Sequence, residues 1–240
     1  MSMKNYSIHV NKNEVFSWIT AEKKTVQTMR DGKTGPLDPR LLHQMERAAD
    51  QIEKSASARY IYNVFELIRE EEGPISLKGS SLRLPGKDIA SLLKECSRCI
   101  LLTVTIGGTV DRILRRAQIS DMADAVLLDF CASSAAEDLC DRIHSDLEEE
   151  YEKKGLYLTD RFSPGYGDLP IGLQSEICRV LQTDKRLGLT VNSGNMLIPS
   201  KSITAVIGIS YRPQPKKISG CANCKMKDTC KFRKAGTTCE

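Results

Sequence analysis

The sequence predicts an α+β protein with a mixed, largely antiparallel central sheet and helices packed on it. Helical and strand patterns are interspersed along the 240 residues, but they do not follow the strict repeat of a doubly wound fold. Residues 99–106 form a continuous apolar run, which is typical of a central strand buried on both faces. Residues 202–211 alternate apolar and polar positions, which indicates a second strand. A helical pattern from Ser120, as the cap, to Lys154 predicts one long helix.

Local signals predict the remaining elements. Asp38 is placed to cap a helix whose first turn holds Pro39, and Asp88 is placed to cap a short helix. A further helix is expected to begin beyond Pro170 and to stop at Gly188. Shorter strands are expected at residues 7–10, 58–67, 73–84, 156–158 and 189–191, residues 15–19 fit a strand or the start of a helix, and residues 192–196 form a polar loop.

The composition is that of an ordinary globular protein, with 40% hydrophobic and 28% charged residues. A net charge of +4 does not demand nucleic acid, and the longest apolar run is too short to span a membrane. The first residues contain no secretion signal, so we expect a cytoplasmic protein whose nine cysteines are reduced thiols or metal ligands. The three histidines lie outside H-E-x-x-H, and no G-x-S-x-G occurs, so hydrolytic chemistry has little support.

The stretch from Arg161 to Pro170, Arg-Phe-Ser-Pro-Gly-Tyr-Gly-Asp-Leu-Pro, is predicted to be a rigid loop between a strand and a helix. Gly165 and Gly167 allow positive φ or the close approach of a ligand. Arg161 offers a planar fork for a carboxylate or phosphate, and Tyr166 offers a ring face and a hydroxyl. The loop is therefore a candidate small-molecule clamp, and the alternative is an ordinary turn with a surface arginine.

Four cysteines gather in the C-terminal segment, with the spacing C-x2-C-x5-C-x8-C. The segment is rich in Gly and Lys and has little apolar content, so it cannot bury enough surface to fold alone. Four thiolates around a metal would supply the missing folding energy. Zinc and a 4Fe-4S cluster both fit, and the alternative is a disordered basic tail with free thiols. The predicted ligands are Cys221, Cys224, Cys230 and Cys239.

The other cysteines are poorer candidates for metal ligands. Cys131 and Cys140 lie nine positions apart on one predicted helix and therefore on opposite faces, so they cannot share a metal. Cys96 and Cys99 form a C-x2-C that leads into a buried strand, where structural thiols are common. The chain is accordingly divided into an N-terminal segment packed on the main domain (1–57), the main domain (58–213) and the Cys-rich tail (214–240).

The loop carries the pattern R-x-x-P-G-Y-x-x-x-P, which resembles the activation domain of cobalamin-dependent methionine synthase. The resemblance extends from about residue 58 to residue 211. It includes the Thr105-Ile106-Gly107 turn, the Ala/Ser-rich long helix with Glu137, and the pattern Met196-x-x-Pro199-x-x-Ser202.

The resemblance implies that the chain binds S-adenosylmethionine, docks on a cobalamin-carrying domain and supports reductive methylation of cob(II)alamin. It implies that Arg161 engages the methionyl carboxylate, that backbone around Phe162 and Ser163 meets the adenosyl part, and that Tyr166 lies near the sulfonium or on the cobalt side. Pro164 and Gly165 complete this implied binding loop.

The sequence also departs from the family pattern. It contains no D-x-H-x-x-G cobalamin signature and no homocysteine or folate module, so the partner is expected to be a separate methionine synthase or another corrinoid protein. A flavodoxin or ferredoxin is the candidate electron donor. Residues 1–57 lie outside the resemblance, which therefore does not identify the acidic ligand for the amino group. Two alternatives are a docking scaffold that has lost the ligand and an iron–sulfur protein that reduces a corrinoid partner.

Overall fold

The central feature of the computed structural model is a six-stranded antiparallel sheet, which confirms the predicted α+β class. The structure describes residues 4–19, 39–70 and 73–214. The strand order is β3-β2-β1-β4-β8-β5, and the two longest pairings join β4 to β1 and to β8. The strands of this sheet are β1 (Arg59–Ile68), β2 (Ile75–Leu77), β3 (Arg83–Leu84), β4 (Cys96–Thr105), β5 (Tyr157–Leu158) and β8 (Ser202–Ser210).

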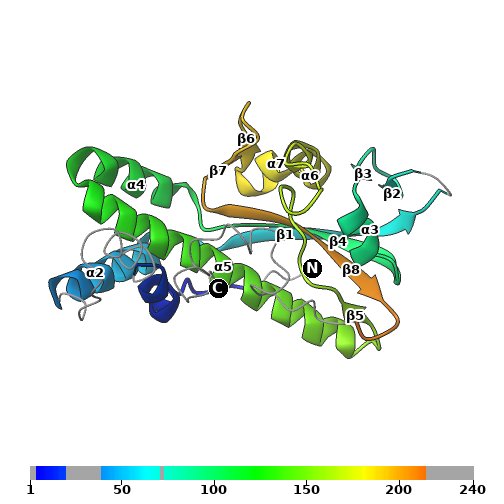
Figure 1. Ribbon diagram of the computed structural model, residues 1–240, viewed down its shortest axis with the longest axis horizontal. Helices are drawn as coiled ribbons and strands as arrows, with labels where there is room; N and C mark the ends of the chain where they lie inside the picture. Colours follow the sequence, from blue (N-terminus) through cyan, green and yellow to red (C-terminus); the bar gives the residue numbers. More distant parts are fainter. Residues whose placement is uncertain (1–3, 20–38, 71–72, 215–240) are drawn as a thin grey trace, which may run out of the picture.

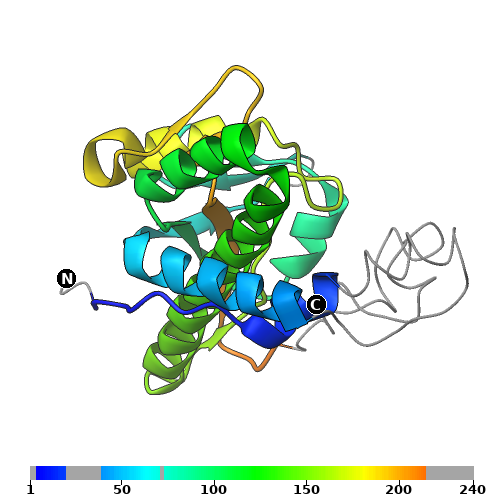
Figure 2. The same ribbon diagram turned by 90° about the vertical axis from the view of Figure 1, so that its left-hand side faces the viewer.

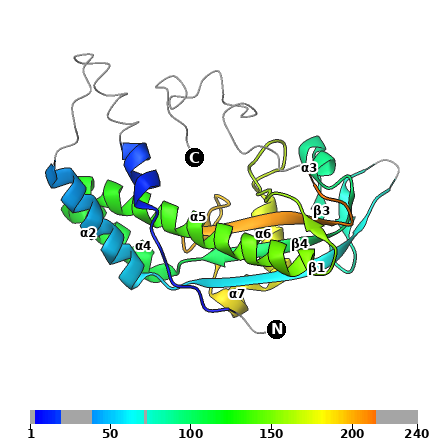
Figure 3. The ribbon, with the colours of Figure 1, turned by 90° about the horizontal axis from the view of Figure 1, so that it is seen from below.

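Helices lie on both faces of the sheet (Figures 1 and 2). One face carries α2 (Pro39–Ser55) and the long helix α5 (Met122–Glu152), and α4 (Gly108–Ser120) packs against α5 at one end. The other face carries α3 (Lys87–Leu92), α6 (Leu173–Leu181) and α7 (Thr183–Leu187). Residues 4–19, of which 12–19 are helical, lie on the same side as α2 and α5 (Figure 3).

Strand β4 separates two hydrophobic core clusters, because its side chains alternate between the faces of the sheet. Ile100 and Leu102 point into the cluster under α5, whereas Cys99 and Leu101 point into the cluster under α3 and α6. All four side chains are fully buried, as predicted for a central strand.

Asp121 caps the N-terminus of the long helix α5, because its side chain accepts hydrogen bonds from the backbone N–H groups of Ala123 (2.9 Å) and Asp124 (3.2 Å). The predicted cap, Ser120, is instead the last residue of α4 and donates to the carbonyl of Arg116. The helix itself is confirmed over nearly its whole predicted length.

Several shorter predictions were wrong. Residues 7–10 do not form a strand, although Val10 is buried in the core under α5. The helix predicted to run to Gly188 is two helices, because Gln182 adopts a left-handed conformation (φ 53°) between them. The predicted polar loop after residue 191 leads into a strand that was not predicted. This strand, β7 (Leu197–Ile198), pairs with β6 (Thr190–Val191) in a separate hairpin. Within the described ranges, the helices are all too short or too polar to cross a bilayer.

Candidate functional site

The Arg161–Pro170 loop is attached to the sheet at its start. The backbone N–H of Phe162 donates to the carbonyl of Val206 in β8 (2.9 Å), and the N–H of Val206 donates back (2.8 Å). Just before the loop, Thr159 makes a similar contact, since its hydroxyl accepts from the N–H of Gly208 (2.8 Å). The loop therefore leaves the sheet with a fixed direction, and its first residues are held beside α5.

Tight turns give the middle of the loop its shape. The N–H of Gly165 donates to the carbonyl of Leu169 (2.8 Å), and the N–H of Tyr166 donates to the carbonyl of Ser163 (3.1 Å). Gly165 has a φ of 94°, a region that side chains other than glycine rarely enter. Pro164 and Leu169 are buried, whereas Tyr166 is 65% exposed. The turns thus present the Tyr166 ring at the surface.

The far end of the loop is attached to α3. The carboxylate of Asp168 accepts hydrogen bonds from the backbone N–H groups of Lys87 (2.6 Å) and Asp88 (3.2 Å). Asp168, and not Asp88 as predicted, therefore satisfies the N-terminal donors of this helix. The loop and the start of α3 lie very close together. A side chain at Gly86 (φ 116°) would collide with the Asp168 carboxylate, and a side chain at Gly167 (φ 54°) would collide with the Asp88 carboxylate.

Arg161 points at α5 and pairs with two carboxylates there. Its Nη2 atom lies 2.5 Å from Oδ1 of Asp141 and 3.3 Å from Oε2 of Glu137. The Arg161 side chain is 20% exposed, whereas those of Glu137 and Asp141 are 47% and 67% exposed. Both contacts use the same guanidinium nitrogen, Nη2, so one edge of the fork is engaged by the protein itself.

The electrostatic environment keeps Arg161 charged. Burial acts to lower its pKa, but the neighbouring acidic groups outweigh this effect, and the pKa lies above the ordinary arginine value. One of these neighbours is the thiol of Cys140, whose own pKa burial raises to about 12. At neutral pH the thiol is uncharged, so Asp141 and Glu137 are the groups that stabilise the cation.

A third carboxylate, Glu14, comes from the N-terminal segment and was missed in the sequence. Its Oε2 accepts a hydrogen bond from the hydroxyl of Ser134 in α5 (2.8 Å), one helical turn before Glu137. Burial raises the pKa of Glu14, and repulsion from Glu137 and Asp141 acts in the same direction. Nothing in the local sequence marks Glu14, because 120 residues separate it from Ser134.

The residues that follow Pro199 connect the sheet to helices α4 and α5 through hydrogen bonds and an ion pair. Asp111 in α4 accepts hydrogen bonds from the backbone N–H and the hydroxyl of Ser200 (2.9 and 2.7 Å). Lys201, 15% exposed, pairs with Asp129 in α5 (2.8 Å) and donates to the hydroxyl of Ser133 (2.8 Å). These residues position the start of β8 beside α4 and α5.

The cysteines that the structure describes are free and buried, four of them in the two main core clusters and Cys178 in a third, smaller cluster. Burial raises the pKa of Cys96 to about 11 and that of Cys99 to about 12, so these thiols are uncharged near neutral pH. Among the described residues, no group of three or more His, Cys, Asp or Glu side chains is arranged to hold a metal. The predicted ligands Cys221, Cys224, Cys230 and Cys239 lie outside the described residues.

Comparisons with known proteins identify the fold. A scan against protein-family models gave no match, and a search of the curated proteins also gave none. Among solved structures, the chain is similar to a crystal structure of the MetH reactivation domain bound to AdoHcy. The TM-score is 0.59 at 12% sequence identity, and the alignment covers 100% of this chain and 87% of that chain. The chain therefore shares the fold of the MetH reactivation domain, which confirms the resemblance at the level of fold.

Proposed function

We propose that this protein binds S-adenosylmethionine and supports reductive methylation of cob(II)alamin on a separate methionine synthase or other corrinoid protein. The proposal joins the resemblance of the loop, the fold shared with a domain bound to AdoHcy, and the arrangement of charges around Arg161.

One observation carries the proposal: the Arg161 guanidinium pairs with two carboxylates where the loop meets α5, and a third carboxylate, that of Glu14, lies close enough to repel both. The methionyl end of the ligand is a zwitterion, whose carboxylate and ammonium are a few ångströms apart. Arg161, which also hydrogen-bonds the thiol of Cys140, suits the carboxylate through the N–H groups that these contacts leave. Glu137, Asp141 and Glu14 suit the ammonium. Glu14 is the proposed acidic ligand that the sequence resemblance did not identify.

The loop backbone limits which groups remain for the adenosyl part. The N–H and C=O of Phe162 are both bonded to Val206, so we assign the adenosyl contacts to Ser163 and keep the ring of Tyr166 for the sulfonium side. A reduced cobalt centre on the partner is itself a strong nucleophile. The task of this chain is then to align the ligand methyl, for which it needs neither a general acid nor a general base.

The docking scaffold is a second candidate, and one observation favours it. The guanidinium of Arg161 already has carboxylate partners within the chain, an arrangement that also occurs in proteins without a ligand. Binding of AdoHcy, measured by calorimetry, separates the candidates: the reactivation protein binds it, and the scaffold does not.

The function is tested with a spectral assay. A corrinoid partner in the cob(II)alamin state is mixed with reductant and S-adenosylmethionine, with and without this protein, and the methylcobalamin spectrum is followed. We expect methylcobalamin to form only when this protein is present. Equal rates with and without it would contradict the proposal for that partner.

Glu14→Gln separates ligand binding from stability. Its raised pKa means that the folded state holds the proton more tightly, so ionisation of Glu14 destabilises the fold as pH rises through this pKa. Glutamine can still accept the hydrogen bond from Ser134 and removes the repulsion. We therefore expect the variant to be more stable than wild type by about 0.5 kcal/mol at pH 7. At pH 4 we expect no gain, because Glu14 is then protonated and uncharged in the wild type as well.

The same substitution is expected to weaken AdoHcy binding by about fivefold to tenfold, because one ligand of the ammonium loses its charge. Thermal unfolding and calorimetry give the two values. Glu53→Gln is the matched control, since Glu53 accepts a hydrogen bond from the backbone of Val10 but pairs with none of the proposed ligand groups. Unchanged affinity for Glu14→Gln would remove Glu14 from the site.

A further inference from the structure

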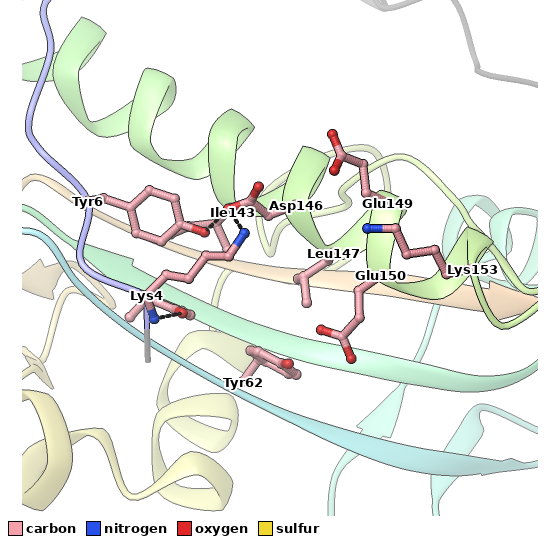
Figure 4. Close-up of a pocket in the computed structure, with 10 residues that line it drawn as sticks. Lys4, Tyr6, Tyr62, Ile143, Asp146, Leu147, Glu149, Glu150 and Lys153 are labelled. Carbon is pink, nitrogen blue, oxygen red and sulfur yellow. Dashed lines mark hydrogen bonds and ion pairs between the residues drawn. The ribbon is translucent and has the colours of Figure 1, made fainter. Parts of the chain in front are cut away.

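A second candidate site lies on the opposite flank of α5, away from Arg161. A cavity of about 300 Å³ opens between this helix, strand β1 and the N-terminal segment (Figure 4). Asp146, which lines it, follows Glu137 by nine positions, so the two side chains leave the helix about half a turn apart. The cavity is therefore separate from the proposed S-adenosylmethionine site.

Three tyrosines form much of the cavity wall. Tyr60 and Tyr62 project from β1 on the same face, and Tyr6 comes from the N-terminal segment. The rings of Tyr6 and Tyr60 meet edge to face, with centroids 5.6 Å apart and an interplanar angle of 77°. Ile143 and Leu147 of α5 add aliphatic surface. The wall is thus an aromatic corner with an apolar lining.

The aromatic rings and carboxylates around this corner favour a cation over an anion. Three carboxylates and two lysines line the cavity, and two of the carboxylates have partners within the chain: Asp146 pairs with Lys4 (3.0 Å) and Glu150 pairs with Lys154 (2.6 Å). The hydroxyl of Tyr6 also donates to Asp146 (2.5 Å). Aromatic faces carry negative electrostatic potential, so an anion would be repelled by both rings and carboxylates.

The protein itself shows that this wall accepts cations. The ammonium of Lys4 lies on Asp146, and the backbone N–H of Lys4 donates to the hydroxyl of Tyr60 (3.1 Å). The guanidinium of Arg142 lies 5.7 Å from the centre of the Tyr6 ring. Burial raises the pKa of Tyr62 to about 12, so its hydroxyl stays neutral beside Glu150. The corner therefore holds a neutral aromatic surface next to carboxylates.

We propose that the cavity formed by Tyr6, Tyr60, Tyr62 and Glu150 binds a small organic cation, such as a methylated ammonium group. Rings supply the cation–π attraction, and the aliphatic side chains of Ile143 and Leu147 contact the methyl groups. Glu150 supplies the counter-charge through its second oxygen, since its Oε1 atom pairs with Lys154 (2.6 Å). A volume of about 300 Å³ is enough for a small ligand of this kind. This inference goes beyond the proposed function and does not depend on it.

The test uses choline as the probe and 3,3-dimethylbutan-1-ol as its neutral isostere. The methyl signals of Ile143 and Leu147 are followed by NMR during titration of the full chain. We expect saturable shifts with choline, and an affinity about tenfold higher than that of the isostere, because only choline carries the charge that the rings attract.

Variants of one wall residue complete the test. Tyr62→Leu is expected to weaken choline binding about tenfold, whereas Tyr62→Phe, which keeps the ring, stays within about twofold of wild type. Tyr211→Leu is the matched control, since Tyr211 is 69% exposed and does not line the cavity. Equal affinity for choline and the isostere, no shift with choline, unchanged binding by Tyr62→Leu, or loss of binding in a folded Tyr62→Phe would each overturn the proposal.

Discussion

Arg161→Ala is expected to lower the affinity for S-adenosylmethionine by about 10- to 150-fold, the range for loss of a charge-assisted hydrogen bond. The guanidinium is the only proposed contact for the ligand carboxylate, and the variant also leaves Glu137 and Asp141 to repel that carboxylate. The measurement is calorimetry with AdoHcy and S-adenosylmethionine at fixed ionic strength.

Stability is expected to change little in this variant, by about 1 kcal/mol or less. The two carboxylates that lose their partner are 47% and 67% exposed, so water can solvate them. Arg142→Ala is the matched control, because Arg142 pairs with Asp138 (2.8 Å) on the same helix but lies outside the proposed ligand site. Full affinity in a folded Arg161→Ala, or weakening of the same size in Arg142→Ala, would contradict the assigned role.

Ile100→Ala is expected to destabilise the fold by about 3 kcal/mol. Ile100 is fully buried at the centre of β4, in the core under α5, so truncation leaves a cavity between the sheet and the helix. For a chain of this length the midpoint of thermal unfolding should fall by roughly 6 to 12 °C. Denaturant unfolding followed by circular dichroism gives the free energy directly.

Ile119→Ala is the control for this second prediction. The Ile119 side chain is 89% exposed at the end of α4, so the same chemical change should alter stability by no more than about 0.5 kcal/mol. A loss at Ile100 no larger than the loss at Ile119 would mean that β4 is not the centre of the core.

The longest elements could be predicted from the sequence because their patterns repeat many times. The buried strand β4 and the long helix α5 each hold enough apolar positions to outweigh local ambiguity. Helix starts were less predictable. Ser120 and Asp121 are adjacent residues with the same capping chemistry, and only the geometry shows that Asp121 caps α5.

Contacts between distant segments could not be predicted from local patterns. Asp168 accepts hydrogen bonds from the first N–H groups of α3, although about 80 residues separate it from this helix in the sequence. Local patterns pointed to Asp88 as the cap, because Asp88 is adjacent in the sequence. Glu14 joins the charged cluster only because the N-terminal segment packs on α5. The candidate loop could be identified because its Arg, Tyr, Pro and Gly residues are contiguous, whereas the carboxylates beside it come from two other segments.

The anchoring of the loop at both ends has a consequence for kinetics. With Phe162 bonded to β8 and Asp168 bonded to α3, the backbone around Arg161 is already ordered before any ligand arrives. Association then loses little conformational entropy, and the free and occupied forms should differ by no more than about 1 Å in this backbone. A single fast phase in stopped-flow mixing, with a rate linear in ligand concentration, is the behaviour of such a preorganised receptor.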